Sequence, residues 1–354
     1  MKILYVGPTA KNSTCEHRLN AMRRLGHEMV VVNTVTGGMD LSRQVERLAN
    51  IVDYHVCNWR LDPYRVNKRL YCELEKEHRY DVVWLDKALM VRSRTLKAIK
   101  RRWPDAVIAS YSPDDQLNPA NHSFIYLRSL PLYDVCFTTK SYNVRELKDL
   151  NAKHVVYVGN GFDPRVHRPT RLTEEERTTY GCDVCFVGTY EKPRAQCLER
   201  VAELPYGLKV WGNDWDKLEH RSRLRGAVQN HAVYGEEYAK RIVASSINLN
   251  FLKKANRDLV TTRSVEIPAC GGFMLAERTA EHQALFEEGV EAEFFGGVEE
   301  MVEKIHYYMQ HKDERRAIAR RGRLRCLRSR YSNDERVKEM LDLVKALPQR
   351  LLGA

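Results

Sequence analysis

The feature that most constrains the fold of this chain is a regular alternation between short apolar segments and amphipathic ones. Residues 2–6 are largely apolar, residues 14–25 place their apolar side chains on one helical face, and residues 28–32 are largely apolar again. Strands without a polar residue at every second position are typical of parallel sheets that are covered on both faces. This strand–helix–strand opening predicts an α/β fold with a doubly wound parallel sheet.

The alternation continues along the chain and pauses once. The pause is the turn-rich sequence GNGFDP at residues 159–164, which is followed by the charge-rich residues 165–177. A polar segment of this kind between two regular runs is typical of a domain boundary. We therefore predict two Rossmann-like domains that face a cleft, with an N-terminal domain over residues 1–165, a C-terminal domain over residues 166–330 and a helical tail over residues 331–354.

The charge of the chain favours anionic partners. Its 354 residues carry a formal net charge of +11, which suits phosphorylated donors, acidic membranes or nucleic acid. Residues 314–331 hold eight arginines, with apolar residues at near-helical spacing. We expect a surface helix with a solvated basic face there, and docking to a membrane surface is the alternative. Basic and aromatic residues are not interleaved as in single-strand binders, which disfavours nucleic acid.

The sequence shows no sign of export. No apolar segment approaches the roughly 20 residues that span a bilayer, and residues 1–9 lack the apolar region of a signal peptide. Nine irregularly spaced cysteines are typical of reduced thiols in such a chain. Cys182 and Cys185 are the only close pair and have no second pair at zinc-site spacing, so we predict no metal site. We expect a cytoplasmic protein, with peripheral contact at the inner membrane face.

Two common nucleotide-binding motifs are missing. The first strand-to-helix turn, at residues 7–13, lacks the G-x-G-x-x-G series of dinucleotide-binding enzymes. The chain also lacks the G-x-x-x-x-G-K-[ST] loop of ATP-hydrolysing enzymes. These absences disfavour a dehydrogenase and a P-loop ATPase.

Two adjacent carboxylates are the candidates for chemistry in the first domain. Asp114 and Asp115 follow the predicted strand at 106–111, at the end of a strand where ligands of open α/β sheets collect. Asp114 could act as general base for an acceptor hydroxyl if burial or mutual repulsion raises the pKa of one carboxylate. The alternative is that one carboxylate caps the next helix while the other is solvated.

The second domain offers a candidate site for a diphosphate. Gly188, Lys192 and Arg194 lie where a strand leads into a helix, so that backbone N–H groups and two cations could bind phosphate without a metal. The alternative is ordinary surface charge. Asn250 ends a later strand and is expected in the same layer.

A carboxylate, an arginine and two glycines complete the candidate site. Arg263 and Glu266 are three residues apart, hence on one face if that segment is helical. A carboxylate can accept both hydroxyls of a ribose, and an arginine can offset developing phosphate charge. Gly271 and Gly272 follow, and their bare backbone could approach a ligand closely.

In these residues the chain resembles glycosyltransferases of the two-domain GT-B architecture, in particular the CgeB-like group with its group-1-type C-terminal domain. The stretches that carry the resemblance are YSPDD at 111–115, FTTKSYNVREL at 137–147, VGNGFDP at 158–164, FVGTYEKPR at 186–194 and RSVEIPACGGFMLAE at 263–277. The resemblance implies that Glu266 is the second carboxylate of a Glu-x7-Glu motif and holds the donor ribose. The first carboxylate would fall on Asp258. Lys192 and Arg194 would stabilise the leaving nucleotide, and Gly271 and Gly272 would let the backbone approach the diphosphate.

We accordingly predict a metal-independent glycosyltransferase of polysaccharide biosynthesis that moves a sugar from a nucleoside-diphosphate sugar to a hydroxyl acceptor. The acceptor is a glycan, a lipid-linked molecule or a protein, and no cofactor is expected besides the donor substrate. Asp114 and Arg263 are the predicted catalytic residues. The alternatives are a sugar-nucleotide epimerase of the same fold, and a non-catalytic protein of polysaccharide assembly or nucleic-acid binding.

Overall fold

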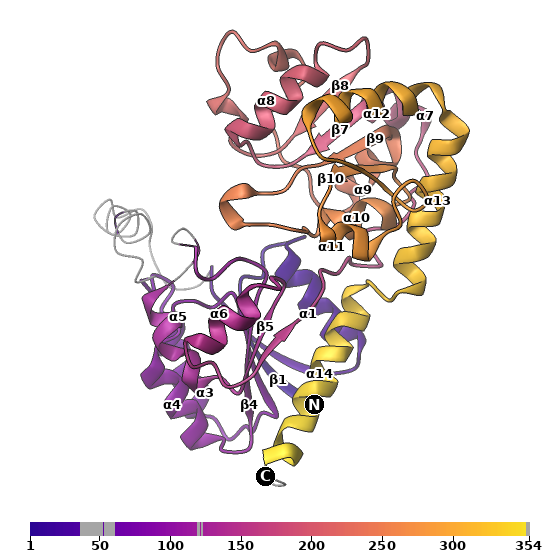
Figure 1. The fold of residues 1–354 in the computed structure, drawn as a ribbon. Helices are drawn as coiled ribbons and strands as arrows, with labels where there is room; N and C mark the ends of the chain where they lie inside the picture. Colours follow the sequence, from indigo (N-terminus) through magenta and orange to yellow (C-terminus); the bar gives the residue numbers. More distant parts are fainter. Residues whose placement is uncertain (36–51, 53–60, 119–120, 122, 352–354) are drawn as a thin grey trace. The chain divides into compact units, whose positions relative to one another are not determined.

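The computed structural model describes residues 1–35, 52, 61–118, 121 and 123–351, and these form two compact units (Figure 1). The first unit comprises Met1–Gly159 together with the segment that begins at Asn333, and the second is Asn160–Ser332. The division falls slightly before the predicted boundary at residue 165. The last helix is part of the first unit, whereas the sequence had suggested a separate tail.

The first unit is built on a six-stranded parallel sheet with the strand order β2-β1-β3-β4-β5-β6. Its strands are β1 (Lys2–Gly7), β2 (Glu28–Asn33), β3 (Val82–Asp86), β4 (Val107–Ser112), β5 (Val135–Thr138) and β6 (Val155–Tyr157). Its described helices are α1 (Thr14–Arg24), α3 (Val66–Leu74), α4 (Ser93–Arg102), α5 (Phe124–Ser129), α6 (Asn143–Asp149) and α14 (Asn333–Leu351), with a 3-10 turn at Leu130–Leu132.

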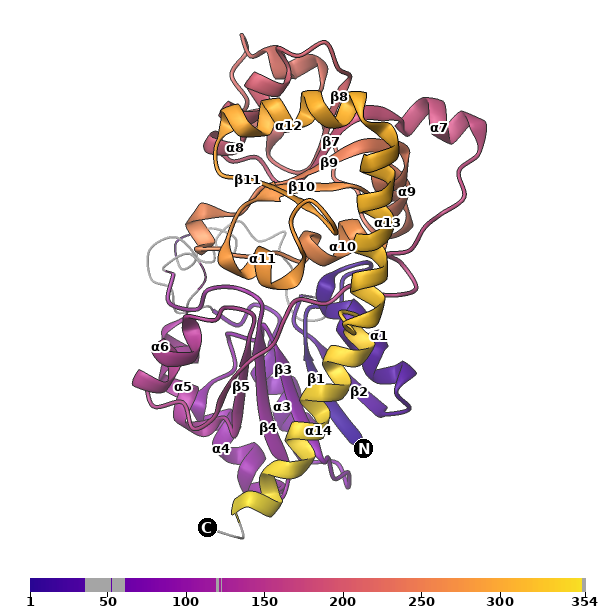
Figure 2. The ribbon, with the colours of Figure 1, turned by 45° about the vertical axis from the view of Figure 1, so that its right-hand side comes forward.

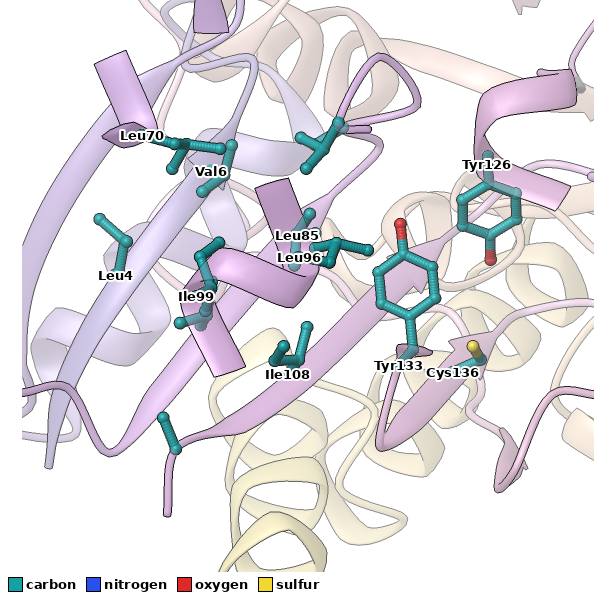
Figure 3. Close-up of a cluster of buried hydrophobic side chains, with 14 of the residues drawn as sticks. Leu4, Val6, Leu70, Leu85, Leu96, Ile99, Ile108, Tyr126, Tyr133 and Cys136 are labelled. Atoms are coloured by element: carbon teal, nitrogen blue, oxygen red, sulfur yellow. The ribbon is translucent and has the colours of Figure 1, made fainter. Parts of the chain in front are cut away.

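Both faces of this sheet are covered, which explains its uninterrupted apolar strands. Side chains at alternate positions of β1 point to opposite faces. Ile3 and Tyr5 pack in the cluster that contains residues of α1 and α14, and α14 lies beside α1 (Figure 2). Leu4 and Val6 pack instead with residues of α3, α4 and α5 (Figure 3).

The second unit repeats this design with a five-stranded parallel sheet in the order β11-β10-β9-β7-β8. Its strands are β7 (Cys182–Val187), β8 (Leu208–Trp211), β9 (Ser245–Asn250), β10 (Met274–Glu277) and β11 (Glu293–Phe295). Its helices are α7 (Glu174–Tyr180), α8 (Lys192–Val201), α9 (Gly235–Ala244), α10 (Arg263–Ala269), α11 (Ala280–Leu285), α12 (Val298–Gln310) and α13 (Lys312–Arg328), with 3-10 turns at Trp215–Lys217, Arg223–Gly226 and Lys254–Asn256.

Helices cover both faces of the second sheet as well. Residues of α8 and α12 form one core cluster with the sheet, and residues of α9 and α10 form another. The prediction of two Rossmann-like domains is thus confirmed, and the arrangement of these domains around a cleft stays a prediction. The arginine-rich segment is the helix α13, as expected from its apolar spacing.

Candidate active site

Most candidate residues of the second unit lie around the ends of β7 and β9, at the topological switch point of its sheet. Successive connections leave the sheet in opposite directions there, since β7 lies between β8 and β9. Ligands of open α/β sheets bind at such a point, beyond the carboxyl ends of the strands. Lys192 and Arg194 follow β7, while Asn250 ends β9 and Arg263 begins the next helix, α10.

Arg194 is buried and fastens the loop after β7 to the end of β9. Its guanidinium donates to the carbonyl oxygen of Thr189 over 3.1 Å and to that of Phe251 over 3.4 Å. Its Nε lies 3.2 Å from a carboxylate oxygen of Glu191. Burial lowers the pKa of Arg194 and the charge of Arg263 lowers it too, against the opposing effect of Glu191. Two guanidinium groups therefore repel each other here, and a bound anion would relieve that repulsion.

Gly188 is closely packed, and both of its backbone polar groups bond within the protein. Its N–H donates to the carbonyl oxygen of Trp211 over 2.8 Å, so it is not free for a ligand. A Cβ at this position would lie 2.5 Å from the ring of Phe186, and its carbonyl oxygen accepts from the indole of Trp215 over 2.9 Å. A role for Gly188 beside the free backbone N–H groups at the start of α8 stays a prediction. Lys192, by contrast, is exposed in the first turn of α8, as predicted.

Asn250 holds the segment that leads into α10. Its amide nitrogen donates to Ser264 Oγ over 3.1 Å, and its amide oxygen accepts from Thr261 Oγ1 over 3.3 Å. Asn250 is completely buried. Asn250 therefore positions the start of α10, and its contact with a ligand stays a prediction.

His282 completes this network in its neutral form. Its Nδ1 lies 2.7 Å from the carbonyl oxygen of Glu277, so Nδ1 carries the hydrogen. Its Nε2 lies 2.7 Å from Ser264 Oγ, which already accepts from Asn250 and from the N–H of Thr261. The Ser264 hydroxyl consequently donates to Nε2. Burial lowers the pKa of His282 to about 4, which keeps the ring neutral and this geometry intact.

Glu266 points to a histidine that the sequence had not singled out. The carboxylate is 8% exposed, and one of its oxygens lies 3.7 Å from Nε2 of His167. His167 Nδ1 accepts the N–H of Asp163 over 3.0 Å, so its hydrogen is on Nε2 and faces Glu266. His167 comes from the charge-rich segment that we predicted to be a boundary without further role. No periodic signal in that segment could have placed it beside α10.

Two buried polar atoms next to Glu266 have no hydrogen-bond partner among the described residues: the Tyr238 hydroxyl and the Arg263 Nε. Tyr238 lies on α9 with its ring edge-on to His167 at 5.6 Å. Burial raises the pKa of Tyr238 well above its ordinary value, and the charge of Glu266 raises it further. A buried polar atom left without a partner costs about 1–3 kcal/mol. Such atoms mark the place where a ligand or water supplies the missing bond.

Gly271 and Gly272 lie at the other edge of the sheet. The helix α10 begins beyond the carboxyl end of β9 and runs back, so the turn after it leads into the amino end of β10. Gly271 has φ +83°, which a helix ending in the left-handed conformation requires. A Cβ on Gly272 would lie 2.5 Å from a methyl group of Ile242 and 2.8 Å from the amide of Asn248. Gly271 thus ends the helix and Gly272 permits close packing, and their approach to the diphosphate stays a prediction.

Asp258 stands where the resemblance places the first carboxylate of the Glu-x7-Glu motif. Its oxygens accept from Asn256 Nδ2 over 2.6 Å and from the N–H of Lys253 over 3.4 Å. Asp258 therefore stabilises its own loop. Its charge also acts on Arg194, so it belongs to the same end of the sheet.

In the first unit, Asp114 and Asp115 have separate roles. Asp114 lies 2.5 Å from the Lys87 ammonium, and Asp115 is fully buried, where it accepts from the N–H of Leu117 and from Asn143 Nδ2. Burial lowers the pKa of Lys87, but the charge of Asp114 and their hydrogen bond outweigh this and raise it. The expected mutual repulsion of two carboxylates is thus not what the structure shows. The role of Asp114 as general base stays a prediction, and its carboxylate is paired with a lysine.

The described residues contain no group of three or more His, Cys, Asp or Glu side chains placed to hold a metal ion. None of the described helices is long and apolar enough to cross a membrane.

Comparison with known proteins relates part of the second unit and the following helix to a known family. Residues 194–342 match the family described as glycosyl transferase-like. These residues make up less than half of the chain and are similar to a glycosyl transferase-like domain. The matched range includes Arg194, Asn250, Arg263 and Glu266, so the domain contains most of the candidate site. The suspected resemblance is confirmed at this level, and the CgeB-like subgroup stays a prediction. No curated protein matches the chain in sequence.

Solved structures share the fold over almost the whole chain. HepE of Anabaena in complex with UDP-glucose is 14% identical with a TM-score of 0.65, and the match covers 97% of this chain and 99% of that one. Sucrose-phosphate synthase of Thermosynechococcus elongatus is 12% identical with a TM-score of 0.65, over 99% and 100% of the two chains. A putative UDP-N-acetylglucosamine 2-epimerase of Listeria monocytogenes is 10% identical with a TM-score of 0.56, over 99% and 97%. At such identities the likeness concerns the fold, and it confirms the GT-B type of two Rossmann-like domains.

Proposed function

We propose that the protein is a glycosyltransferase whose second unit binds a nucleoside-diphosphate sugar at the ends of β7 and β9. The observation that carries the proposal is the group formed by Glu266, Arg263 and Tyr238, which combines a buried carboxylate with two polar atoms that have no partner among the described residues. It lies within the glycosyl transferase-like domain. Glu266 accepts the ribose hydroxyls, and Arg263 binds the diphosphate.

Departure of the nucleoside diphosphate is the step that these residues assist. Negative charge grows on the diphosphate as its bond to the sugar breaks, so cations fixed near it stabilise the transition state more than the ground state. Arg194 holds the loop and adds positive charge, while the exposed Lys192 can reach the phosphates from the start of α8. The proposal places no metal in this step.

The uracil base is our choice for the nucleotide. HepE was solved with UDP and with UDP-glucose, and its fold matches this chain over 97% of its length. A thermal-shift panel of UDP, GDP, TDP and CMP, followed by their sugars, tests the class of ligand and names the base. UDP and its sugars should raise the melting temperature, because a ligand that binds only the folded state stabilises it. A panel in which no nucleotide shifts the melting temperature contradicts the proposal.

The acceptor is a hydroxyl compound that the first unit binds, with Asp114 as the base that takes its proton. Asp114 follows β4 at the carboxyl edge of that sheet, and its carboxylate lies 2.5 Å from the ammonium of Lys87. An Asp114→Asn variant should therefore lose transfer to the acceptor and keep nucleotide binding. A variant that transfers as well as the wild type contradicts this role.

A sugar-nucleotide epimerase is the second candidate, since the putative epimerase of Listeria monocytogenes has a similar fold. An epimerase acts on the donor without an acceptor. NMR spectra of the donor incubated with the protein alone distinguish the two: an isomerised sugar supports the epimerase, and release of the nucleotide supports the transferase.

Peripheral contact with an anionic membrane is also part of the proposal. The exposed side of α13 carries Arg316, Arg320 and Arg328 around the exposed Leu324 and Leu327. A basic helix face with apolar side chains suits a surface of anionic lipids. Vesicles of phosphatidylglycerol should bind the wild type and bind Arg316→Glu/Arg320→Glu/Arg328→Glu about a hundredfold more weakly, each lost cation being worth about 1 kcal/mol. Equal binding of both proteins would exclude α13 as the contact.

A further inference from the structure

The first unit has a cavity between α4 and α5. The cavity has a volume of about 1040 Å³, well above the roughly 300 Å³ at the lower end of ligand pockets. Its described lining is apolar side chains and three arginines: Leu61, Phe124, Leu127, Arg92, Arg94 and Arg128.

The three arginines at the cavity have no acidic partner among the described residues. Arg94 and Arg128 are exposed and Arg92 is half-buried. None of them has an ion pair or a side-chain hydrogen bond in the part of the chain that the structure describes. A guanidinium stays charged at any physiological pH and matches the oxygen pairs of a phosphate. Three such groups around one cavity therefore favour a phosphate as ligand.

The walls between these arginines are apolar. Phe124 is 49% exposed and Leu61 is 43% exposed, and Leu127 lines the same cavity. Exposed large apolar side chains that gather in a pocket mark a binding site more often than isolated ones do. A free phosphate would use the arginines alone, whereas a phosphate that carries a hydrocarbon chain would use the apolar walls too.

The cavity also lies at the carboxyl edge of the first sheet, where a ligand is expected. The helices α4 and α5 follow β3 and β4, so their first turns lie beyond the carboxyl ends of these strands. Asp114 follows β4 directly and belongs to the same edge. Open α/β sheets bind their ligands at this edge.

We propose that this cavity binds the acceptor, and that the acceptor is a lipid with a phosphate head group; this rests on the proposed glycosyltransferase function. Arg92, Arg94 and Arg128 bind the phosphate, and the hydrocarbon chain lies along Leu61, Phe124 and Leu127.

Calorimetric titration of the full chain with hexyl and octyl phosphate, below their micelle concentrations, tests the cavity directly. Octyl phosphate should bind more tightly than hexyl phosphate, by up to about fourfold for each added methylene that is fully buried. Inorganic phosphate lacks the hydrocarbon chain, and octyl glucoside lacks the phosphate. Each should bind at least tenfold more weakly than octyl phosphate. Inorganic phosphate that binds as tightly as octyl phosphate would show a site for free phosphate and overturn the lipid assignment.

Variants locate the site. Arg94→Glu/Arg128→Glu should weaken octyl phosphate binding at least tenfold, while Arg101→Glu, an exposed arginine at the far end of α4, should leave it unchanged. Phe124→Ala should reduce the gain between hexyl and octyl phosphate. If the double variant and Arg101→Glu lose the same affinity for octyl phosphate, the proposal is overturned. Such a result would reflect the net charge of the protein and not a site at the cavity.

A parallel titration with UDP separates this proposal from the proposed function. Wild-type protein that binds UDP and no alkyl phosphate refutes the lipid pocket alone. Protein that binds octyl phosphate but no nucleotide leaves the pocket in place and refutes its use as an acceptor site.

Discussion

Arg263 and Tyr238 each bury a polar atom that no described residue satisfies. Most polar side chains around them are committed to the protein: Asn250, Ser264 and His282 bind one another, and Arg194 binds carbonyl oxygens. At the residue scale, this difference separates side chains that hold the site from those that are left for a ligand.

Tyr238→Phe tests this distinction. Removing a buried hydroxyl that has no partner should leave the free energy of unfolding unchanged or raise it by up to about 1 kcal/mol, because the desolvation cost of that hydroxyl disappears. Binding of UDP should weaken several-fold if the hydroxyl meets the ligand. Chemical denaturation and calorimetry measure the two effects. A variant that is clearly less stable than the wild type would show that the hydroxyl is already satisfied in the free protein.

Single residues also show what the sequence could and could not predict. Lys192, Arg194, Arg263 and Glu266 lie at the end of the sheet where they were expected, because residues that follow a parallel strand share its carboxyl edge. His167 and Tyr238 reach Glu266 only through the packing of the segment before β7 and of α9. Contacts of that kind follow from tertiary structure, which residue spacing does not contain.

At the scale of elements, the direction of α10 decides which of its ends can serve a ligand. A strand-to-helix turn lies at the carboxyl edge of a parallel sheet, and a helix-to-strand turn lies at the amino edge. Gly271 and Gly272 form a turn of the second kind. At Gly272 the backbone is closely approached by Ile242 and Asn248, so packing within the protein accounts for this glycine.

Alanine variants of these two glycines should separate stability from binding. Gly271→Ala should cost about 1–2 kcal/mol, because its backbone is left-handed. Gly272→Ala should cost about 1–3 kcal/mol by overpacking against Ile242 and Asn248. Neither should change the affinity for UDP at a temperature where both variants are folded. Weaker UDP binding by the folded variants would indicate that these glycines contact the nucleotide.

The loop that leads into α10 depends on a neutral His282. The pKa of His282 is about 4 in the folded chain and about 6.5 in the unfolded chain, so the unfolded chain gains this proton first as the pH falls. The network therefore contributes full stability above pH 6.5 and loses about 3 kcal/mol as the pH falls to 4. His282→Gln, which does not titrate, should lack this component when the free energy of unfolding is measured at several pH values. Parallel curves for the two proteins would contradict the assignment.

At the scale of the whole molecule, the alternation of strands and helices was sufficient to predict two Rossmann-like units, because strands that are apolar throughout fit only sheets covered on both faces. The place of the last helix could not be predicted in this way. Its apolar residues Val337, Met340, Leu341 and Val344 fit any covered sheet face, and they pack in the first unit. The chain thus crosses from one unit to the other twice.

The central claim is that Arg263 and Glu266 bind and activate a sugar nucleotide, and release of UDP from UDP-glucose measures it most directly. Arg263→Ala and Glu266→Ala should each lower kcat/KM by about 100-fold, the effect of losing one charge-assisted contact to the reacting diphosphate or the ribose. Arg320→Ala, which removes an exposed arginine of α13, should retain wild-type activity. Unchanged kcat/KM in both Arg263→Ala and Glu266→Ala would contradict the claim.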